Sequence, residues 1–456
     1  MKKIISIMVI FLLSFFVLSI FLLKNDTLYK KTKNVIKKNI SYSLKIKLKK
    51  VYTIINSLYS SRIIPALYYN HEIRKNFILY KRSDTPKIES TKRSFVTSVY
   101  SSKELKKNGP KNYLDISKGN LFSITGNGIF SYTKLDNLNK NQFKLKTIRT
   151  NINKIVGYHY IAKNNGFILD LFIRKDEVFI SYVRELKEDC FNTSIIKGNL
   201  NLNKIHFEEY FTPNECIDVI NDYGIFRFMQ SGGAISDFNN NDILLSTGEF
   251  RYRDEAQNKK SVFGKVLRIQ GDGSYEVLSM GHRNPQGLFY DSDNNIIISA
   301  EHGPKGGDEI NLNRLSDIKI KNFGWPIASY GEHYGAQGDK NSETYLKLLK
   351  SHKNNGFIEP FVNYVPSIAP TRVIAIKDNS LGNKQKNIFL SALGDNLEEG
   401  DMSIHRILIN ENYETLESEI IPINHRIRDM IFSKKLNKMI LFLEKYGSIA
   451  TIEVYR

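Results

Sequence analysis

The stretch Asp293-Asn294-Asn295-Ile296-Ile297-Ile298 shows the pattern that decides the fold, a polar turn followed at once by a short apolar run. Such runs, bounded by turn residues, are typical of buried β-strands. The same pattern recurs along the chain, with apolar runs at Val178–Val183, Ile243–Leu245, Ile388–Leu390 and Met439–Leu443. Successive runs begin 65, 53, 92 and 51 residues apart, and the longest interval contains a polar insertion around 335–355.

A repeat of this length, made of several short strands, is typical of propeller blades. The roughly 345 residues from 111 to 456 would hold about six blades at this spacing. No long amphipathic helical pattern interrupts this region. The sequence therefore predicts an all-β fold, a six-bladed β-propeller over 111–456, with a pair of irregular β-sandwiches as the alternative.

The positive charge is concentrated near the N-terminus. The 456 residues carry 66 Lys and Arg against 47 Asp and Glu, a net charge of +19. Residues 1–100 hold 20 basic and 4 acidic side chains, whereas the rest of the chain is almost balanced. A nucleic-acid-binding domain carries its basic footprint on the folded part, so we expect no nucleic-acid partner.

The N-terminal segment is predicted to attach the protein to a membrane. The run from Ile4 to Leu23 contains no charged residue, and twenty helical residues span about 30 Å, the thickness of the bilayer core. We expect a transmembrane anchor over 1–23, with a cleaved signal peptide or a buried helix as alternatives. A basic stalk over 24–110 follows, which either lies on anionic headgroups or acts as a solvated spacer. Its lysines favour a cytoplasmic domain by the positive-inside rule.

The two cysteines, Cys190 and Cys216, lie 26 positions apart. Neither has a second Cys or His at zinc-ligand spacing, so a zinc knuckle is not expected. They form either a disulfide or two separate buried thiols, and these alternatives remain open at this point. A disulfide would favour an extracytoplasmic domain.

The block 281–326 concentrates the polar chemistry of the chain. Planar donors suited to carboxylates and carbonyls come from Arg283, Asn284 and Gln286. Turns rich in glycine and proline present backbone carbonyls, and Asp308 and Glu309 add carboxylates, which together are the oxygen ligands that calcium prefers. The block reads Gly281-His282-Arg283-Asn284-Pro285-Gln286-Gly287, then Glu301-His302-Gly303-Pro304-Lys305-Gly306-Gly307-Asp308-Glu309-Ile310-Asn311, then Asn322-Phe323-Gly324-Trp325-Pro326.

This combination resembles the soluble aldose sugar dehydrogenases and the glucose/sorbosone dehydrogenase family, strongly over 281–326 and more weakly over 111–456. The resemblance implies a six-bladed propeller that binds pyrroloquinoline quinone (PQQ) and Ca²⁺ on its axis. The residues that it assigns to the quinone are Arg283, Asn284, Gln286, Arg426 and Arg428. The residues that it assigns to calcium are Gly303 and Pro304, through their carbonyls, and Glu309 with Asp308 at a second, structural site.

The chain departs from the family pattern where the catalytic base is expected. Gln230 stands at the position of the family's catalytic His, and Ala234 stands where the family has Arg. An amide can hydrogen-bond a hydroxyl group but cannot accept its proton near neutral pH. In some relatives a Lys contacts the quinone after a strand like Ile388–Leu390, but this chain reads Ser391-Ala392-Leu393-Gly394 there.

These features favour an oxidoreductase, a membrane-anchored PQQ- and calcium-dependent aldose dehydrogenase that oxidises a sugar hydroxyl by hydride transfer to the quinone. The expected partners are a small sugar, the membrane through residues 4–23, and an electron acceptor that the sequence does not specify. The alternative is an inactive propeller that binds a carbohydrate or protein. From the family's habit and the cysteine pair, we expect a single-pass protein of the bacterial cytoplasmic membrane with the propeller in the periplasm.

Overall fold

The computed structural model describes residues 75–453, except for 85–87, 91–93, 96, 108–110, 157–166, 222–223, 226–229, 317–318, 333–347 and 378–384. The chain divides into two compact units, 1–64 and 65–456, and the described residues all belong to the second. The predicted anchor over 1–23 and most of the predicted stalk lie outside the described residues. Within the described ranges, no helix is long and apolar enough to cross a membrane.

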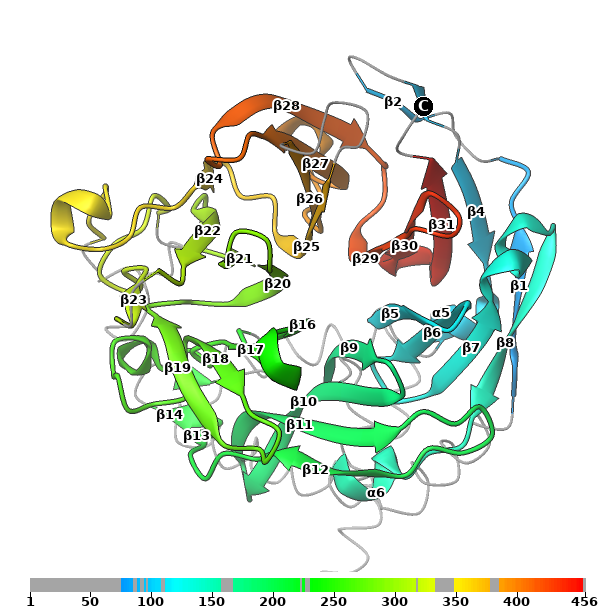
Figure 1. The fold of residues 1–456 in the computed structure, drawn as a ribbon, viewed down its shortest axis with the longest axis horizontal. Coiled ribbons are helices and arrows are strands. Elements are labelled where there is room, and N and C mark those ends of the chain that lie inside the picture. The colour runs from blue at the N-terminus through cyan, green and yellow to red at the C-terminus, as the bar shows by residue number, and fades with distance from the viewer. Residues whose placement is uncertain are drawn as a thin grey trace, which may run out of the picture. The chain divides into compact units, whose positions relative to one another are not determined.

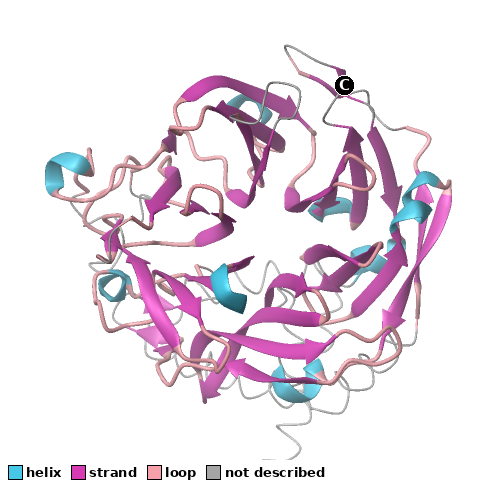
Figure 2. Cartoon of the chain, viewed as in Figure 1, coloured by secondary structure: helices cyan, strands magenta, loops and turns pink. Residues whose placement is uncertain are grey.

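The described residues of the second unit form one nine-stranded, two five-stranded and two four-stranded sheets, with two short hairpins. These sheets divide into six blades of four antiparallel strands, here called blades 1 to 6, arranged around a centre (Figures 1 and 2). The innermost strand of each blade contacts the innermost strands of both neighbouring blades, which closes the ring. This arrangement confirms the prediction of an all-β propeller-like fold.

Blades 1 to 3 are formed from the first half of the ring, and each runs from its inner to its outer strand in chain order. Their strands are β5 (Asn112–Ser117), β6 (Asn120–Thr125), β7 (Phe130–Lys134) and β8 (Gln142–Ile148); β9 (Ile168–Arg174), β10 (Glu177–Lys187), β11 (Cys190–Asn199) and β12 (Phe207–Phe211); and β16 (Gly232–Asp237), β17 (Ile243–Thr247), β18 (Lys265–Ile269) and β19 (Tyr275–Met280).

Blades 4 to 6 complete the ring in the same way, except that the outer strand of blade 6 comes from the N-terminal side. Their strands are β20 (Pro285–Asp291), β21 (Ile296–Glu301), β22 (Asp308–Arg314) and β24 (Val362–Tyr364); β25 (Pro370–Lys377), β26 (Lys386–Ala392), β27 (Ser403–Ile409) and β28 (Thr415–Pro422); and β29 (Ile427–Ser433), β30 (Lys438–Leu443), β31 (Ser448–Glu453) and β4 (Thr97–Ser101).

Minor elements decorate the blades. β13 adds to blade 2 by pairing with β11, and β23 adds to blade 3 by pairing with β19. Four further strands form two short hairpins, β2 with β3 and β14 with β15. Their bounds, with those of the two short α-helices among the described residues, are β2 (Ile88–Glu89), β3 (Ser94–Phe95), β13 (Ile217–Asp218), β14 (Ile220–Asn221), β15 (Gly224–Ile225), β23 (Lys321–Asn322), α5 (Lys103–Lys107) and α6 (Ile152–Val156).

The ring is closed by hydrogen bonds between the two ends of the propeller sequence. β4 pairs antiparallel with β31, so that Val99 lies opposite Ala450. β1 (Phe77–Lys81) then pairs with both β4 and β8 and joins the outer edges of blades 6 and 1. The propeller therefore begins before residue 111, because β1 and β4, from the stretch expected to be a stalk, supply hydrogen bonds that close the ring.

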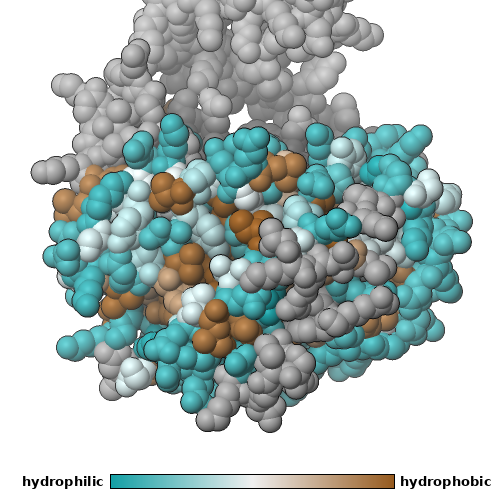
Figure 3. All heavy atoms as spheres, turned by 90° about the horizontal axis from the view of Figure 1, so that it is seen from above, coloured by the Kyte–Doolittle hydropathy of each residue, from teal (hydrophilic) through white to brown (hydrophobic). Residues whose placement is uncertain are grey.

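The predicted apolar runs are the second strands of consecutive blades. They form β10, β17, β21, β26 and β30, in blades 2 to 6. Their side chains fill the interfaces between blades; the largest buried cluster contains both Phe179 of β10 and Ile440 of β30, each 0% exposed. Full burial of such a side chain contributes about 1.5–3 kcal/mol. The surface in Figure 3 is mostly hydrophilic, with small separate apolar patches.

Cys190 and Cys216 form a disulfide. It joins the first residue of β11 to the residue that precedes β13, and so fastens that short edge strand to blade 2. The choice between a disulfide and two separate thiols, which the sequence left open, is resolved in favour of the bond.

Candidate functional site

The predicted quinone-binding residues gather at the N-terminal ends of the inner strands. Arg283 and Asn284 directly precede β20, and Gln286 is its second residue. Arg428 is the second residue of β29, on the opposite side of blade 5. Its Nη1 donates to Oε1 of Gln286 at 3.3 Å, which links blade 6 to blade 4 past the inner strand of blade 5. The predicted set from two distant parts of the chain therefore converges on one end of the axis.

Arg283 is the most highly connected of these residues. Its backbone N–H donates to Oε2 of Glu301 at 2.7 Å. Its Nη1 donates to the carbonyl oxygens of His302 at 3.2 Å and Gly303 at 2.7 Å. The guanidinium lies 5.3 Å from the ring centroid of Trp325, within cation–π range. These contacts hold the Arg283 side chain in place, and the side chain is only 6% exposed.

Gln230, at the predicted base position, is held between a carboxylate and a guanidinium. Its amide orientation follows from its partners: nitrogen donates to Oε1 of Glu249 at 2.8 Å, and oxygen accepts from Nη2 of Arg283 at 2.5 Å. The φ of Gln230, 64°, lies in the left-handed region. A Cβ on Gly248 would lie 1.9 Å from the carbonyl oxygen of Gln230, so only glycine fits at position 248. The Gly248-Glu249 pair therefore brings a buried carboxylate against the position of the missing base.

Asn284 connects this part of the site to the next strand. Its Oδ1 accepts from the backbone N–H of Gly232, the first residue of β16, at 3.1 Å. Ala234, two residues further along, packs in a small apolar cluster with Leu244, Val266 and Leu288. The methyl side chain at this position is part of an apolar interface between blades 3 and 4, which a guanidinium would enter.

Arg426 and Arg428 share one carboxylate from the loop after β30. Arg428 Nη2 lies 3.1 Å from Oε1 of Glu444, and Arg426 Nε lies 3.3 Å from Oε2. Arg426 also pairs with Asp395 at 2.9 Å. Nε of Arg428 is buried and has no hydrogen-bond acceptor among the contacts that the structure describes. Lys111 lies close to Arg428 and Glu444; burial first, and then the charge of Arg428, lower the pKa of Lys111 to about 8.

The two histidines of the block have structural partners. His282 is fully buried, with Nδ1 2.8 Å from Glu301 and Nε2 2.8 Å from Ser279. Nε2 of His302 lies 2.8 Å from the carbonyl oxygen of Pro370. Burial, followed by the charge of Arg283, lowers the pKa of His302 to about 3, so this imidazole is neutral. Each histidine thus fixes its own loop.

The residues predicted to hold calcium lie in and beside the loop between β21 and β22. The Gly303 carbonyl accepts from Arg283, and the Pro304 carbonyl accepts from Ser367 at 3.4 Å. A Cβ on Gly303 would lie 1.8 Å from the carbonyl oxygen of Gly307, so this turn requires glycine. The two carbonyls therefore lie in the tight turn that the sequence predicted.

Asp308 and Glu309 have different surroundings. The Asp308 carboxylate accepts from the backbone N–H groups of Gly303 at 2.9 Å, Ile368 at 2.9 Å and Ala369 at 2.7 Å. Glu309 lies 3.3 Å from His352, and burial raises the pKa of Glu309. Within the described part of the chain, no group of three or more His, Cys, Asp or Glu side chains is placed to hold a metal ion.

An ion cluster on the axis escaped the sequence prediction. Arg372, on β25, donates from Nη1 and Nη2 to Asp170 of β9, at 2.9 and 2.7 Å, and from Nε to Asp429 of β29 at 2.8 Å. Asp429 also accepts from the Leu114 backbone N–H on β5 at 2.7 Å. Arg372, Asp170 and Asp429, here called the axial cluster, therefore tie blades 1, 2, 5 and 6 together. The sequence contained one signal for this cluster, which is that Arg372, Asp170 and Asp429 each interrupt an apolar strand with a charge.

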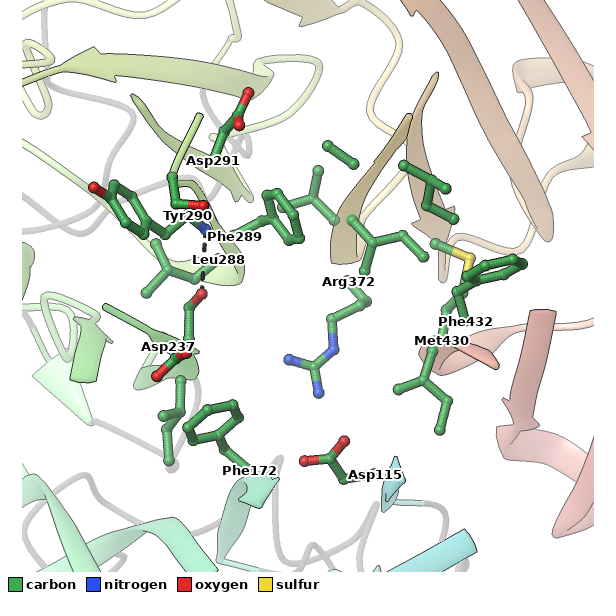
Figure 4. Close-up of a pocket in the computed structure, with 18 of the residues that line it drawn as sticks. Asp115, Phe172, Asp237, Leu288, Phe289, Tyr290, Asp291, Arg372, Met430 and Phe432 are labelled. Carbon is green, nitrogen blue, oxygen red and sulfur yellow. Dashed lines mark hydrogen bonds between the residues drawn. The ribbon is translucent and has the colours of Figure 1, made fainter. Parts of the chain in front are cut away.

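A cavity of about 1480 Å³ opens on the other side of the axial cluster. Figure 4 shows Arg372 pointing into it, with Asp115 facing the guanidinium and Phe172 and Phe432 on its walls. Burial raises the pKa of Asp115 to about 7. None of the predicted site residues lines this cavity, so the convergent polar groups and the cavity occupy different regions of the axis.

Comparison with known proteins shows which family the chain belongs to. The family model described as Glucose / Sorbosone dehydrogenase matches residues 144–449, more than half of the chain. The chain is 26% identical over 256 residues to aldose sugar dehydrogenase YliI of Escherichia coli, covering 51% of this chain and 64% of that protein. It is 25% identical over 244 residues to quinoprotein glucose dehydrogenase B of Acinetobacter calcoaceticus, covering 41% and 49%. The chain thus spans less than two thirds of either relative.

Solved structures agree in fold. The apo-form of the soluble aldose sugar dehydrogenase from Escherichia coli superposes with a TM-score of 0.57 at 18% identity, covering 78% of this chain and 99% of that one. The PQQ-bound aldose sugar dehydrogenase from Streptomyces coelicolor superposes with a TM-score of 0.53 at 15% identity, covering 83% and 98%. Together with the family model, these findings confirm the predicted relationship: the chain belongs to the glucose/sorbosone dehydrogenase family.

Proposed function

We propose that the protein is a PQQ- and calcium-dependent dehydrogenase of aldose sugars, whose cofactor binds at the N-terminal ends of the inner strands. The observation that carries this proposal is the convergence of Arg283, Asn284, Gln286 and Arg428 on one end of the axis. Related proteins are named as aldose sugar dehydrogenase and quinoprotein glucose dehydrogenase, which supports both the cofactor and the substrate class.

The chemistry of this donor set fits an anionic quinone. Guanidinium groups bind carboxylates through paired N–H donors, and amides bind carbonyl oxygens. Nε of Arg428 is a buried donor that lacks an acceptor among the described contacts, a group for which a ligand oxygen would remove the cost of desolvation. Arg283, Asn284, Gln286 and Arg428 would therefore hold the quinone, with Arg426 as a further carboxylate partner.

Calcium would be held by the carbonyl oxygens of Gly303 and Pro304. Backbone carbonyls are ligands that this cation accepts, and glycine at 303 is sterically required for the turn that presents them. Glu309 would belong to a second, structural calcium site. The Asp308 carboxylate already accepts three backbone hydrogen bonds, so its contribution would be to hold the loop in shape.

The reaction requires a hydride acceptor and a proton acceptor. A quinone held by Arg283, Asn284, Gln286 and Arg428 would supply the hydride acceptor for the carbon that carries the sugar hydroxyl. Gln230 would hydrogen-bond that hydroxyl and position it, since an amide does not take up its proton. Loss of a positioned base typically costs about 10²–10⁴ in rate, so we expect slow turnover.

A specific observation favours an inactive binding protein as the second candidate. The Gln230 amide is already engaged on both sides, by Glu249 and Arg283. A side chain held in this way keeps the pocket ordered without supplying a base. Such a protein would retain the ligand site but bind a carbohydrate or protein partner without oxidising it.

We further propose that residues 4–23 anchor the protein in the bacterial cytoplasmic membrane, with the propeller in the periplasm. The uncharged run is long enough to span a bilayer. The disulfide between Cys190 and Cys216 supports an oxidising compartment. A reporter fused after residue 456 that is active only in the cytoplasm would contradict this orientation.

The test is reconstitution of the full chain with PQQ and Ca²⁺, followed by dye-linked oxidation of D-glucose and other aldoses. The proposal predicts calcium-dependent PQQ binding and slow dye reduction, both lost in Arg283→Met. Arg314→Met, an exposed arginine on β22, is the matched control and should behave as the unaltered protein. PQQ binding without turnover would favour the second candidate. Absence of PQQ binding would overturn the proposal that the protein is a PQQ-dependent dehydrogenase.

A further inference from the structure

Lys111 occupies a position that the family resemblance did not assign. It directly precedes β5, the inner strand of blade 1. Gln230 stands just before β16, and Asn284 directly precedes β20. Because all inner strands run in the same direction around the ring, residues at these positions lie at the same level of the axis. Lys111 therefore belongs by topology to the layer that contains the proposed quinone ligands.

Local contacts fix the position of Lys111 within that layer. Its carbonyl oxygen accepts from the Gly126 backbone N–H at 2.8 Å. β5 packs directly against β29, and the Leu114 N–H of β5 donates to Asp429 of β29. Lys111 is thereby held beside the start of β29, where Arg426 and Arg428 lie, and it is only partly exposed.

This corner of the site brings three cations together, Lys111, Arg426 and Arg428. Glu444 is shared between the two arginines, Asp395 pairs with Arg426 and the charge of Asp429 acts on Arg428, and the structure describes no ion pair of Lys111 with any of these carboxylates. The charge of Arg428 opposes that of Lys111, and only Glu444 offsets it. A partly buried cation beside another cation is unfavourable unless anions offset the repulsion, and a carboxylate of the bound ligand would add a second anion to Glu444.

We infer that Lys111 binds a carboxylate of the quinone cofactor together with Arg428, and so replaces the lysine that some relatives place after the strand equivalent to Ile388–Leu390. This inference rests on the proposed function, because it concerns the same ligand. The replacement comes from blade 1, whereas the missing lysine would lie on blade 5. The anion-binding side of the site would thus be built from blades 1 and 6.

The amine of Lys111 gives the inference a pH signature. Burial, and next the charge of Arg428, lower the pKa of Lys111 to about 8. The other charged group that acts on Lys111 is Glu444, in the loop after β30, and Tyr113 lies two residues further along, on β5. Burial raises the pKa of Tyr113, so that its hydroxyl stays neutral across this range. Affinity for an anionic ligand should therefore fall between pH 7 and pH 9.5 as Lys111 loses its proton.

The experiment measures the equilibrium affinity of the full chain for PQQ as a function of pH, in the presence of Ca²⁺. The fluorescence of Trp325 is the readout, because it is the single tryptophan of the chain and lies on Arg283. Lys111→Met should weaken PQQ binding about 10- to 100-fold at pH 7 and abolish the fall above pH 7. Lys111→Arg should stay within about threefold at pH 7 and remain flat up to pH 9.5.

Lys118→Met is the matched control, since Lys118 lies on blade 1 just beyond the other end of β5 and pairs with Asp176 at the surface. It should leave both affinity and pH profile unchanged. Unaltered affinity and pH profile in Lys111→Met would overturn the inference while leaving the proposed function intact. So would a Lys111→Met protein that binds PQQ normally but loses turnover. Absence of PQQ binding by the unaltered chain would overturn both.

Discussion

Replacing Gln230 by histidine should convert a positioned amide into a positioned base. The backbone at this residue has φ of 64°, a conformation that His adopts more readily than most residues. The side chain has a carboxylate partner in place, because the Gln230 amide nitrogen lies 2.8 Å from Oε1 of Glu249. A histidine that donates one ring N–H to a carboxylate presents its other nitrogen as an acceptor, which we expect to face the axis.

The size of the effect follows from these contacts. A positioned general base contributes about 10²–10⁴ in rate. The substitution also removes the hydrogen bond between the amide oxygen and Arg283, which costs about 1–2 kcal/mol of local stability or ligand affinity. We therefore expect kcat for an aldose to rise about 10²-fold or more, with PQQ affinity reduced by no more than about 30-fold. Ala234 should stay unchanged, because an arginine there would enter the apolar cluster between blades 3 and 4.

The assay is dye-linked oxidation of D-glucose by the chain loaded with PQQ and Ca²⁺, at saturating cofactor. Gln230→Asn is the matched control, since it alters the same side chain but supplies no base. It should show no gain. The reasoning would be refuted if Gln230→His folds, binds PQQ and oxidises sugar no faster than the unaltered protein.

Two further predictions concern stability. Arg372→Met leaves Asp170 and Asp429 buried without their cation, which should cost about 3–5 kcal/mol of unfolding free energy near pH 7.5. Burial raises the pKa of Asp170 and Arg372 lowers it; the variant's folded carboxylate should therefore hold its proton to higher pH, and the loss should shrink at pH 5. An equal loss at both values, measured by urea unfolding, would contradict this. Removing the Cys190–Cys216 bond opens a 26-residue separation, worth about 3.5 kcal/mol. Reductant should lower the urea midpoint of the unaltered protein but leave that of the double serine variant unchanged.

The repeating core of the fold was predictable from the sequence because five blades carry a continuous apolar second strand. The strands that close the ring were harder to recognise. β4 reads Thr97-Ser98-Val99-Tyr100-Ser101, and only Val99 and Tyr100 are buried. It is held by backbone pairing with β31 and β1, and pairing between distant segments leaves little trace in local hydrophobicity. The boundary at 111 was therefore placed too late.

The same distinction, between features visible in local sequence and contacts between distant segments, applies to the site. Residues within one dense block, such as Arg283 and Asn284, were recognisable because their neighbours in sequence are also their neighbours in space. The axial cluster was not, because Arg372 and Asp170 lie 202 positions apart. Lys111 likewise stands in an ordinary Lys-Asn-Tyr context, and only the closure of the ring places it beside Arg428. Contacts across a propeller axis depend on closure of the whole ring, and a single strand does not contain that information.

A crystal structure of the chain with PQQ and Ca²⁺ bound tests the central claim most directly. The account predicts quinone density at the N-terminal ends of β20 and β29, with its oxygens in contact with Arg283, Asn284 and Arg428. Density confined to the opposite cavity, between Phe172 and Phe432, would contradict it. So would crystals grown with saturating PQQ that hold none.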